Sequence, residues 1–190
     1  RLLGKASCLG STEKPLGIAG IWSLIKTKAF MLADHPDKQM YAEYYPHIFT
    51  AQTQWIADNK DALNIVFVLH AGDITNGNLP YHWRNASDSM RVLDGVVPYT
   101  IVMGNHDMGP GGDCSVRESL FNHYFPVSCY QALPTFGGTF ERGMLDSSFH
   151  LFNAGGTDWL VLALEYLPRD QVLKWADGVL SSHPHCRVII

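Results

Sequence analysis

The spacing of apolar residues changes several times along the chain and predicts alternating helices and strands. Apolar and packing residues recur at helical spacing over residues 46–60, and Pro46 suits the first position of a helix. The run from Asn64 to His70 is almost continuously apolar, which is typical of a strand buried on both faces. A helix followed by a buried strand is the repeating unit of a layered α/β domain.

The same alternation continues to the end of the sequence. We expect helices over residues 80–94, 115–124 and 169–181, an irregular excursion over 127–148, and strands over 29–33, 99–103, 149–153, 159–164 and 187–190. Gly155 and Gly156 separate two of these strands and predict a hairpin. Residues 1–28 show no clear period and are expected to be a poorly ordered leader, with one α/β domain over 29–190 and a mostly parallel sheet flanked by helices.

Composition narrows the class of protein. The 190 residues are 46% hydrophobic and 17% charged, as in an ordinary globular domain. Fourteen Lys and Arg against eighteen Asp and Glu give a net charge of −4, which argues against a nucleic-acid-binding surface. No apolar run reaches the roughly 18 residues of a membrane span. The four cysteines have no CxxC spacing, and the sequence leaves open whether Cys114 pairs with Cys129.

Three polar clusters follow three of the predicted strands. They are Asp37-Lys38-Gln39, Gly72-Asp73 and Gly104-Asn105-His106-Asp107. The carboxyl ends of parallel strands meet at one edge of a sheet, so we expect the clusters to converge there. Carboxylate and amide oxygens suit hard divalent cations, and two such cations can clamp a phosphoryl group. His106 is placed to protonate a leaving alkoxide, with Asp107 orienting its ring.

The second and third clusters together resemble the calcineurin-like metallophosphoesterase family. The stretches Gln52–Ile56, Phe67–Asp73, Phe136–Phe140 and Trp159–Glu165 are also similar to its bacterial-type branch. The resemblance covers about residues 29–190 and implies a layered metallophosphoesterase-type sandwich. It also implies an enzyme that hydrolyses phosphate mono- or diesters by a metal-bound hydroxide at a dinuclear site. By the resemblance alone, we expect a secreted or periplasmic location.

The resemblance assigns roles to individual residues. Asp37 and Gln39 are expected to bind the first of two divalent ions, whose identity (Mn, Fe, Zn or Mg) stays open. Asp73 is expected to bridge both ions, and Asn105 to bind the second. By the same resemblance, His106 is the general acid or stabilises the phosphoryl charge, and Asp107 is its partner. The sequence does not indicate the substrate, and we expect specificity to come partly from the excursion over 108–148.

The sequence leaves several alternatives open. Asp34 and His35 could replace Asp37 and Gln39 as the first ligand pair. The family completes its site with three later histidines, and the sequence contains none of these up to Ile190, which we expect to lie within a strand. His183-Pro184-His185 precedes that point and is not assigned to the metals. The alternative to an enzyme is therefore a non-catalytic fragment that lacks the C-terminal histidine ligands.

Overall fold

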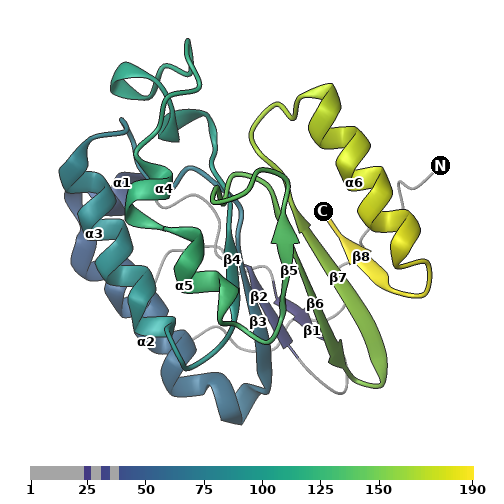
Figure 1. Ribbon diagram of the computed structural model, residues 1–190. Helices are drawn as coiled ribbons and strands as arrows, with labels where there is room; N and C mark the ends of the chain where they lie inside the picture. The colour runs from purple at the N-terminus through teal and green to yellow at the C-terminus, as the bar shows by residue number, and fades with distance from the viewer. Residues whose placement is uncertain (1–23, 27–30, 35–38) are drawn as a thin grey trace.

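Two four-stranded sheets lie face to face, with helices on the outer side of each (Figure 1). The structure is a computed structural model that describes residues 24–26, 31–34 and 39–190. The first sheet contains β1 (Leu24–Lys26), β2 (Met31–Asp34), β3 (Ile65–His70) and β4 (Tyr99–Ile101). The second contains β5 (Phe136–Thr139), β6 (Ser148–Ala154), β7 (Thr157–Ala163) and β8 (Arg187–Ile189). The mixed α/β sandwich predicted from the sequence is confirmed.

The two sheets differ in the direction of their strands. In the first sheet β2, β3 and β4 are parallel, and only β1 is antiparallel to its neighbour. In the second sheet β5, β6 and β7 are antiparallel, and β8 runs parallel to β7. Gly155 and Gly156 connect β6 to β7, with φ angles of 61° and 74°, and so short a connection requires antiparallel strands. The expected parallel arrangement therefore describes the first sheet only.

The long helices agree with the apolar spacing. The helices are α1 (Gln39–Tyr44), α2 (Pro46–Leu63), α3 (Pro80–Met90), α4 (Phe121–Tyr124), α5 (Val127–Gln131) and α6 (Asp170–Ser182), with short 3-10 turns at Arg91–Leu93, Asn105–Asp107 and Pro110–Gly112. Helix α2 begins at Pro46, as predicted, and Asn64 ends it in the left-handed conformation with φ 49°.

Other expectations about local structure are corrected. The helix expected over 115–124 is limited to Phe121–Tyr124, because the preceding backbone is bonded to other loops, as in the 2.9 Å hydrogen bond from Gly109 N to Glu118 O. The excursion over 127–148 contains α5 and β5, and β5 is ordered by pairing with β6. Strand β1 lies within the expected leader over 1–28. The rest of that segment lies outside the described residues, so the expected leader stays a prediction.

Apolar clusters hold these layers together. Between the first sheet and its helices lie large buried side chains, including Phe49, Ile56, Trp83, Met90 and Ile101. Between the sheets, the rings of Phe67 and Phe152 stack at 5.0 Å. Helix α6 covers the outer side of the second sheet, where its Ala176 and Val179 join a cluster with Leu160 and Leu162 (Figure 1). Burial of these faces supplies most of the free energy that favours this arrangement.

Among the described residues, no helix has both the length and the apolar character needed to cross a bilayer. Cys114 and Cys129 are both exposed and each is a free thiol. The disulfide that the sequence left open is therefore not formed.

His150 on β6 is a fully buried histidine in the space between the sheets. Its ring contacts the rings of Phe67 at 5.2 Å and Phe136 at 5.5 Å, and Nδ1 lies 3.2 Å from the hydroxyl of Thr135. Burial lowers the pKa of His150 to about 4. The folded protein thus keeps this imidazole neutral at a pH where the unfolded chain protonates it.

We expect the free energy of unfolding to fall on acidification because of His150. An ordinary histidine has a pKa of about 6.5, so below that pH the unfolded state binds the extra proton. The loss should be about 2 kcal/mol between about pH 7.5 and about pH 5. Urea denaturation of the wild type and His150→Gln measures it, with the exposed His47→Gln as control. An equal pH dependence in the wild type and His150→Gln would contradict the assignment.

Candidate metal centre

The loops that follow β3 and β4 contact each other at one edge of the first sheet. His70 and Ile101, the last residues of the two strands, are register partners. Gly72 has a φ of +97°, and a Cβ on it would lie 3.0 Å from Gly104 N. A Cβ on Gly104 would lie 2.5 Å from Asp73 N and would overlap the carboxylate of Asp73. Glycine is therefore required at both positions by the close approach of the two loops.

Asp73 directs its carboxylate toward the loop after β4. Its Oδ1 accepts a hydrogen bond of 3.2 Å from the backbone N of His106. The residue has a φ of 49°, a left-handed conformation that Asp tolerates better than most side chains. Asn105 and His106 lie in the adjoining 3-10 turn and are half-buried, as is Asp73. The predicted convergence of Asp73 with the Asn105–Asp107 cluster is thus present in the fold.

The carboxylate of Asp107 is hydrogen-bonded to residues of both loops. Its Oδ2 accepts hydrogen bonds from the backbone N of Ile74 at 3.0 Å and of Gly104 at 2.8 Å. Its Oδ1 accepts from Thr75, from the backbone N at 2.7 Å and from the hydroxyl at 3.0 Å. Burial raises the pKa of Asp107 to about 6, although these hydrogen bonds act in the opposite direction. The His106 ring is not among the four donors, so the expected pairing of Asp107 with His106 stays a prediction.

Two residues that support the site were not singled out in the sequence. Thr75 bonds to Asp107 and also accepts from the backbone N of Asn78 at 3.3 Å. The side chain of Asn78 donates to Gly109 O at 3.1 Å and accepts from Leu120 N at 3.0 Å. The run Thr75-Asn76-Gly77-Asn78, directly after the second cluster, is rich in residues that bond to nearby backbone, and this signal could have identified them.

The first cluster is only partly described. Asp34 is the last residue of β2 and pairs with Leu69, so β2 ends at the same edge as β3. Gln39 begins α1 and is half-buried, and its Oε1 is buried with no hydrogen-bond partner. Asp37 and His35 lie outside the described residues. The choice between Asp37 with Gln39 and Asp34 with His35 therefore remains open.

His70 and Glu165, near this edge, are both held by contacts with other residues of the protein. His70 is buried, and its Nδ1 accepts a hydrogen bond of 3.3 Å from Gly72 N, so it packs against the loop that follows β3. Glu165 follows β7, is buried, and pairs with Arg169 at 2.9 Å and Arg117 at 3.7 Å. Burial acts to raise the pKa of Glu165, but its hydrogen bonds to Arg169 outweigh this effect and the pKa is lowered.

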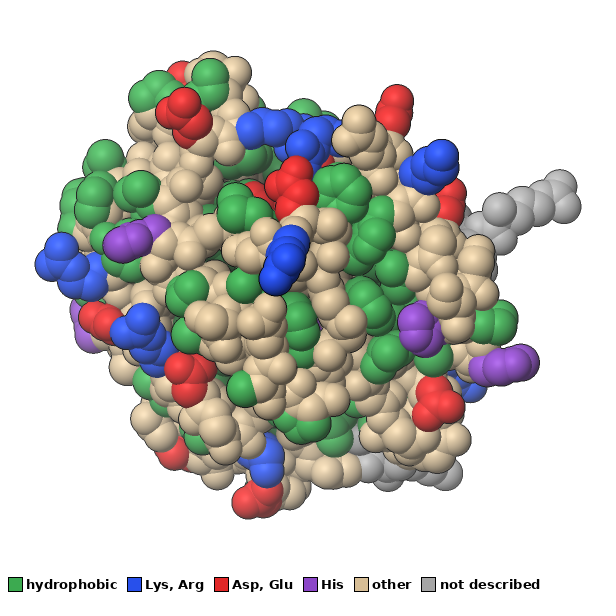
Figure 2. Space-filling view, viewed as in Figure 1, with side chains coloured by type: hydrophobic (Ala, Val, Ile, Leu, Met, Phe, Trp, Pro, Cys, Tyr) green, Lys and Arg blue, Asp and Glu red, His purple; other side chains and the backbone are tan. Residues whose placement is uncertain are grey.

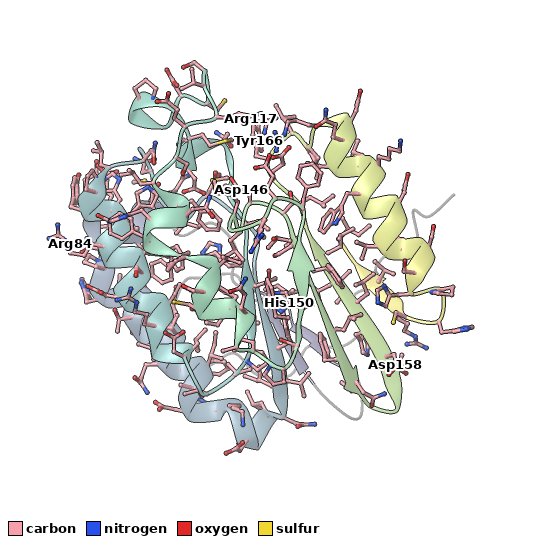
Figure 3. The ribbon with its side chains drawn as sticks, in the orientation of Figure 1. Arg84, Arg117, Asp146, His150, Asp158 and Tyr166 are labelled. Carbon is pink, nitrogen blue, oxygen red and sulfur yellow. The ribbon has the colours of Figure 1, made fainter. Side chains whose placement is uncertain are left out.

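Arg117 connects the two halves of the fold above this edge. It donates hydrogen bonds to the carbonyl oxygens of Tyr166 at 3.0 Å and Leu167 at 2.5 Å. Figure 3 labels Arg117 near the top of the view, Tyr166 directly below it and Asp146 lower down. Figure 2 shows basic and acidic side chains mixed at the same place.

The donor set at the meeting point of the loops fits divalent metal ions. The described residues place no three His, Cys, Asp or Glu side chains together in a way that could hold a metal. The oxygen donors of Asp73 and Asn105 are of the kind that Mg²⁺ and Mn²⁺ prefer. Gln39, at the start of α1, has a side-chain oxygen of the same kind that is buried and unpartnered.

This chain has relatives among known proteins. A model of calcineurin-like phosphoesterases matches residues 35–187. The uncharacterized protein YvnB of Bacillus subtilis (strain 168) is 37% identical over 156 residues, which cover 81% of this chain and only 12% of YvnB. A purple acid phosphatase, PPD1, from yellow lupin (Lupinus luteus) seeds has a TM-score of 0.47 and 17% identity, over 83% of this chain and 28% of that one.

Proposed function

The chain belongs to the calcineurin-like phosphoesterase family, and from this premise we propose that it hydrolyses phosphate mono- or diesters with two divalent metal ions. Mn, Fe, Zn and Mg remain candidates for the ions. The observation that carries the proposal is the contact between the Asp73 loop and the Asn105–Asp107 turn, with the Asp73 carboxylate against His106 N. A phosphoester substrate and a location outside the cytoplasm are parts of the same proposal.

Each residue has a proposed task. Asp73 would hold both ions, Asn105 would hold one of them, and Gln39 with Asp37 would hold the other. The ions, when bound, supply Lewis-acid polarisation of the phosphoryl group and activation of water. His106 donates a proton to the departing alkoxide, since its ring lies on the turn that carries Asn105. Asp107 holds the two loops together through its four hydrogen bonds.

The second candidate is a scaffold that binds a cation weakly and does not catalyse hydrolysis. The absence of three His, Cys, Asp or Glu side chains around one point of the described residues favours it. Reading the gene beyond Ile190 distinguishes the two candidates. A histidine soon after Ile190, followed by Gly-His-x-His, would favour the enzyme, whereas a stop codon would favour the scaffold.

We expect the gene product, stripped of metal by a chelator, to regain hydrolysis of an aryl phosphate when Mn²⁺ is added. Asn105→Ala removes one oxygen ligand and should lower kcat/KM by about a hundredfold. Asn153→Ala, an exposed change on the β6–β7 hairpin, is the matched control and should leave the rate unchanged. Hydrolysis that persists after removal of the metal, or an unchanged rate in Asn105→Ala, would contradict the proposal.

A further inference from the structure

Glu43 on α1 is a half-buried carboxylate beside the Asp73 loop. Its Oε2 accepts a hydrogen bond of 2.5 Å from the side-chain amide of Asn76, three residues after Asp73. Burial acts to raise the pKa of Glu43, but hydrogen bonds from Tyr44 and Asn76 outweigh it and the pKa lies below its usual value. In the part of the chain that the structure describes, no Lys or Arg forms an ion pair with this carboxylate.

His82 on α3 faces the same carboxylate. It is 2% exposed, and neither of its ring nitrogens has a hydrogen-bond partner. Burial lowers the pKa of His82, although Glu43 opposes this effect, so the ring is neutral at pH 7 and one nitrogen is an acceptor. Its Nε2 lies 3.9 Å from Glu43 Oε1. That separation is too long for a direct hydrogen bond, but one donor group can bond to both atoms at about 2.9 Å each.

Two exposed tyrosines border this pair. The ring of Tyr81 contacts the His82 ring edge-on, with centroids 4.1 Å apart, and is 47% exposed. Tyr44, adjacent to Glu43, is 56% exposed, and the hydrogen bond to Glu43 raises its pKa. Aromatic faces attract organic cations. A charged carboxylate, a free acceptor nitrogen and aromatic rings together match a protonated primary amine, which has positive charge and three N–H donors.

Asn76 connects Glu43 to the candidate metal centre. A Cβ on Gly112 would lie 2.6 Å from His106 O and 2.9 Å from Asn76 O. The residue that bonds Glu43 and the turn that carries Asn105 therefore pack against the same glycine. We propose that Glu43 and His82, bordered by Tyr44 and Tyr81, bind the ammonium group of the substrate. The substrate class is then phosphate esters of amino alcohols, and this assignment rests on the proposed hydrolysis.

The first test measures binding of the cation without any phosphate. Ethylammonium chloride is titrated into the chain at constant ionic strength, and the NMR signals of the His82 ring report binding. We expect saturable binding that neutral 1-propanol does not reproduce. Glu43→Gln should weaken ethylammonium binding at least about tenfold, and Tyr44→Leu should weaken it about threefold. As the control, Asp88→Asn removes an equal negative charge about two turns after His82 on α3, and it should leave the affinity for ethylammonium unchanged. Equal affinity in the wild type and Glu43→Gln would overturn the proposal.

The protein's own side chains are a second possible occupant. Lys38, five residues before Glu43, lies outside the described residues. Tighter ethylammonium binding by Lys38→Gln than by the wild type would show that a lysine of this chain fills the subsite, and would overturn the proposal. Unchanged affinity in Lys38→Gln would support it.

The second test compares two substrates of the gene product in Mn²⁺. We expect kcat/KM for ethanolamine phosphate to exceed that for ethyl phosphate at least about tenfold, and Glu43→Gln to remove this preference. Equal kcat/KM values with no ethylammonium binding would contradict the subsite alone. Ethylammonium binding without hydrolysis of either ester would contradict the proposed hydrolysis, and with it the substrate class.

Discussion

Replacing Asp73 with asparagine is expected to lower hydrolysis of an aryl phosphate by the gene product about a thousandfold, because the proposed bridging ligand loses its charge. Asparagine also tolerates the left-handed conformation that Asp73 adopts at φ 49°. It keeps an oxygen that can accept the hydrogen bond from His106 N. The change therefore tests the charge with little disturbance of the loop.

Metal binding gives a second readout of the same change. The affinity of the chain for Mn²⁺, measured by electron paramagnetic resonance of the free ion, should fall at least about a hundredfold in Asp73→Asn. Asp158→Asn on the β6–β7 hairpin removes an equal charge away from the loops and serves as control. Wild-type Mn²⁺ affinity and activity in a folded Asp73→Asn protein would show that this carboxylate is not a metal ligand.

Replacing Asp107 with alanine is expected to lower the free energy of unfolding by about 3–5 kcal/mol. The change removes the acceptor of four hydrogen bonds and leaves three backbone N–H groups without their partner in a buried place. Urea denaturation measures the loss, with the exposed Asp61→Ala as control. A loss of less than about 1 kcal/mol would show that Asp107 does not hold the two loops together.

Where local pattern determines structure, the sequence predicted the fold well. Pro46 and the apolar spacing behind it place α2, and the two glycines at 155 and 156 place the hairpin, since both signals act within a few residues. The expected helix over 115–124 was wrong in its first half. Hydrogen bonds from distant residues such as Asn78 hold that backbone instead, and apolar spacing carries no information about such contacts.

The candidate site was likewise predictable only where the signal is local in the sequence. The glycines before Asp73 and Asn105 indicated two loops that approach closely, and the fold brings them together. The contact of Asp107 with the loop after β3 depends on hydrogen bonds from residues more than thirty positions away. The pairing of Glu43 with His82 likewise depends on the packing of α1 against α3. Contacts of this kind arise from tertiary structure, which a single sequence does not display.

Anomalous diffraction from crystals grown in Mn²⁺ shows whether the loops after β3 and β4 form one metal centre. We expect an anomalous peak within about 2.5 Å of both a carboxylate oxygen of Asp73 and the side-chain oxygen of Asn105. A Mn²⁺ peak elsewhere in the molecule, with none in contact with Asp73 or Asn105, would contradict it.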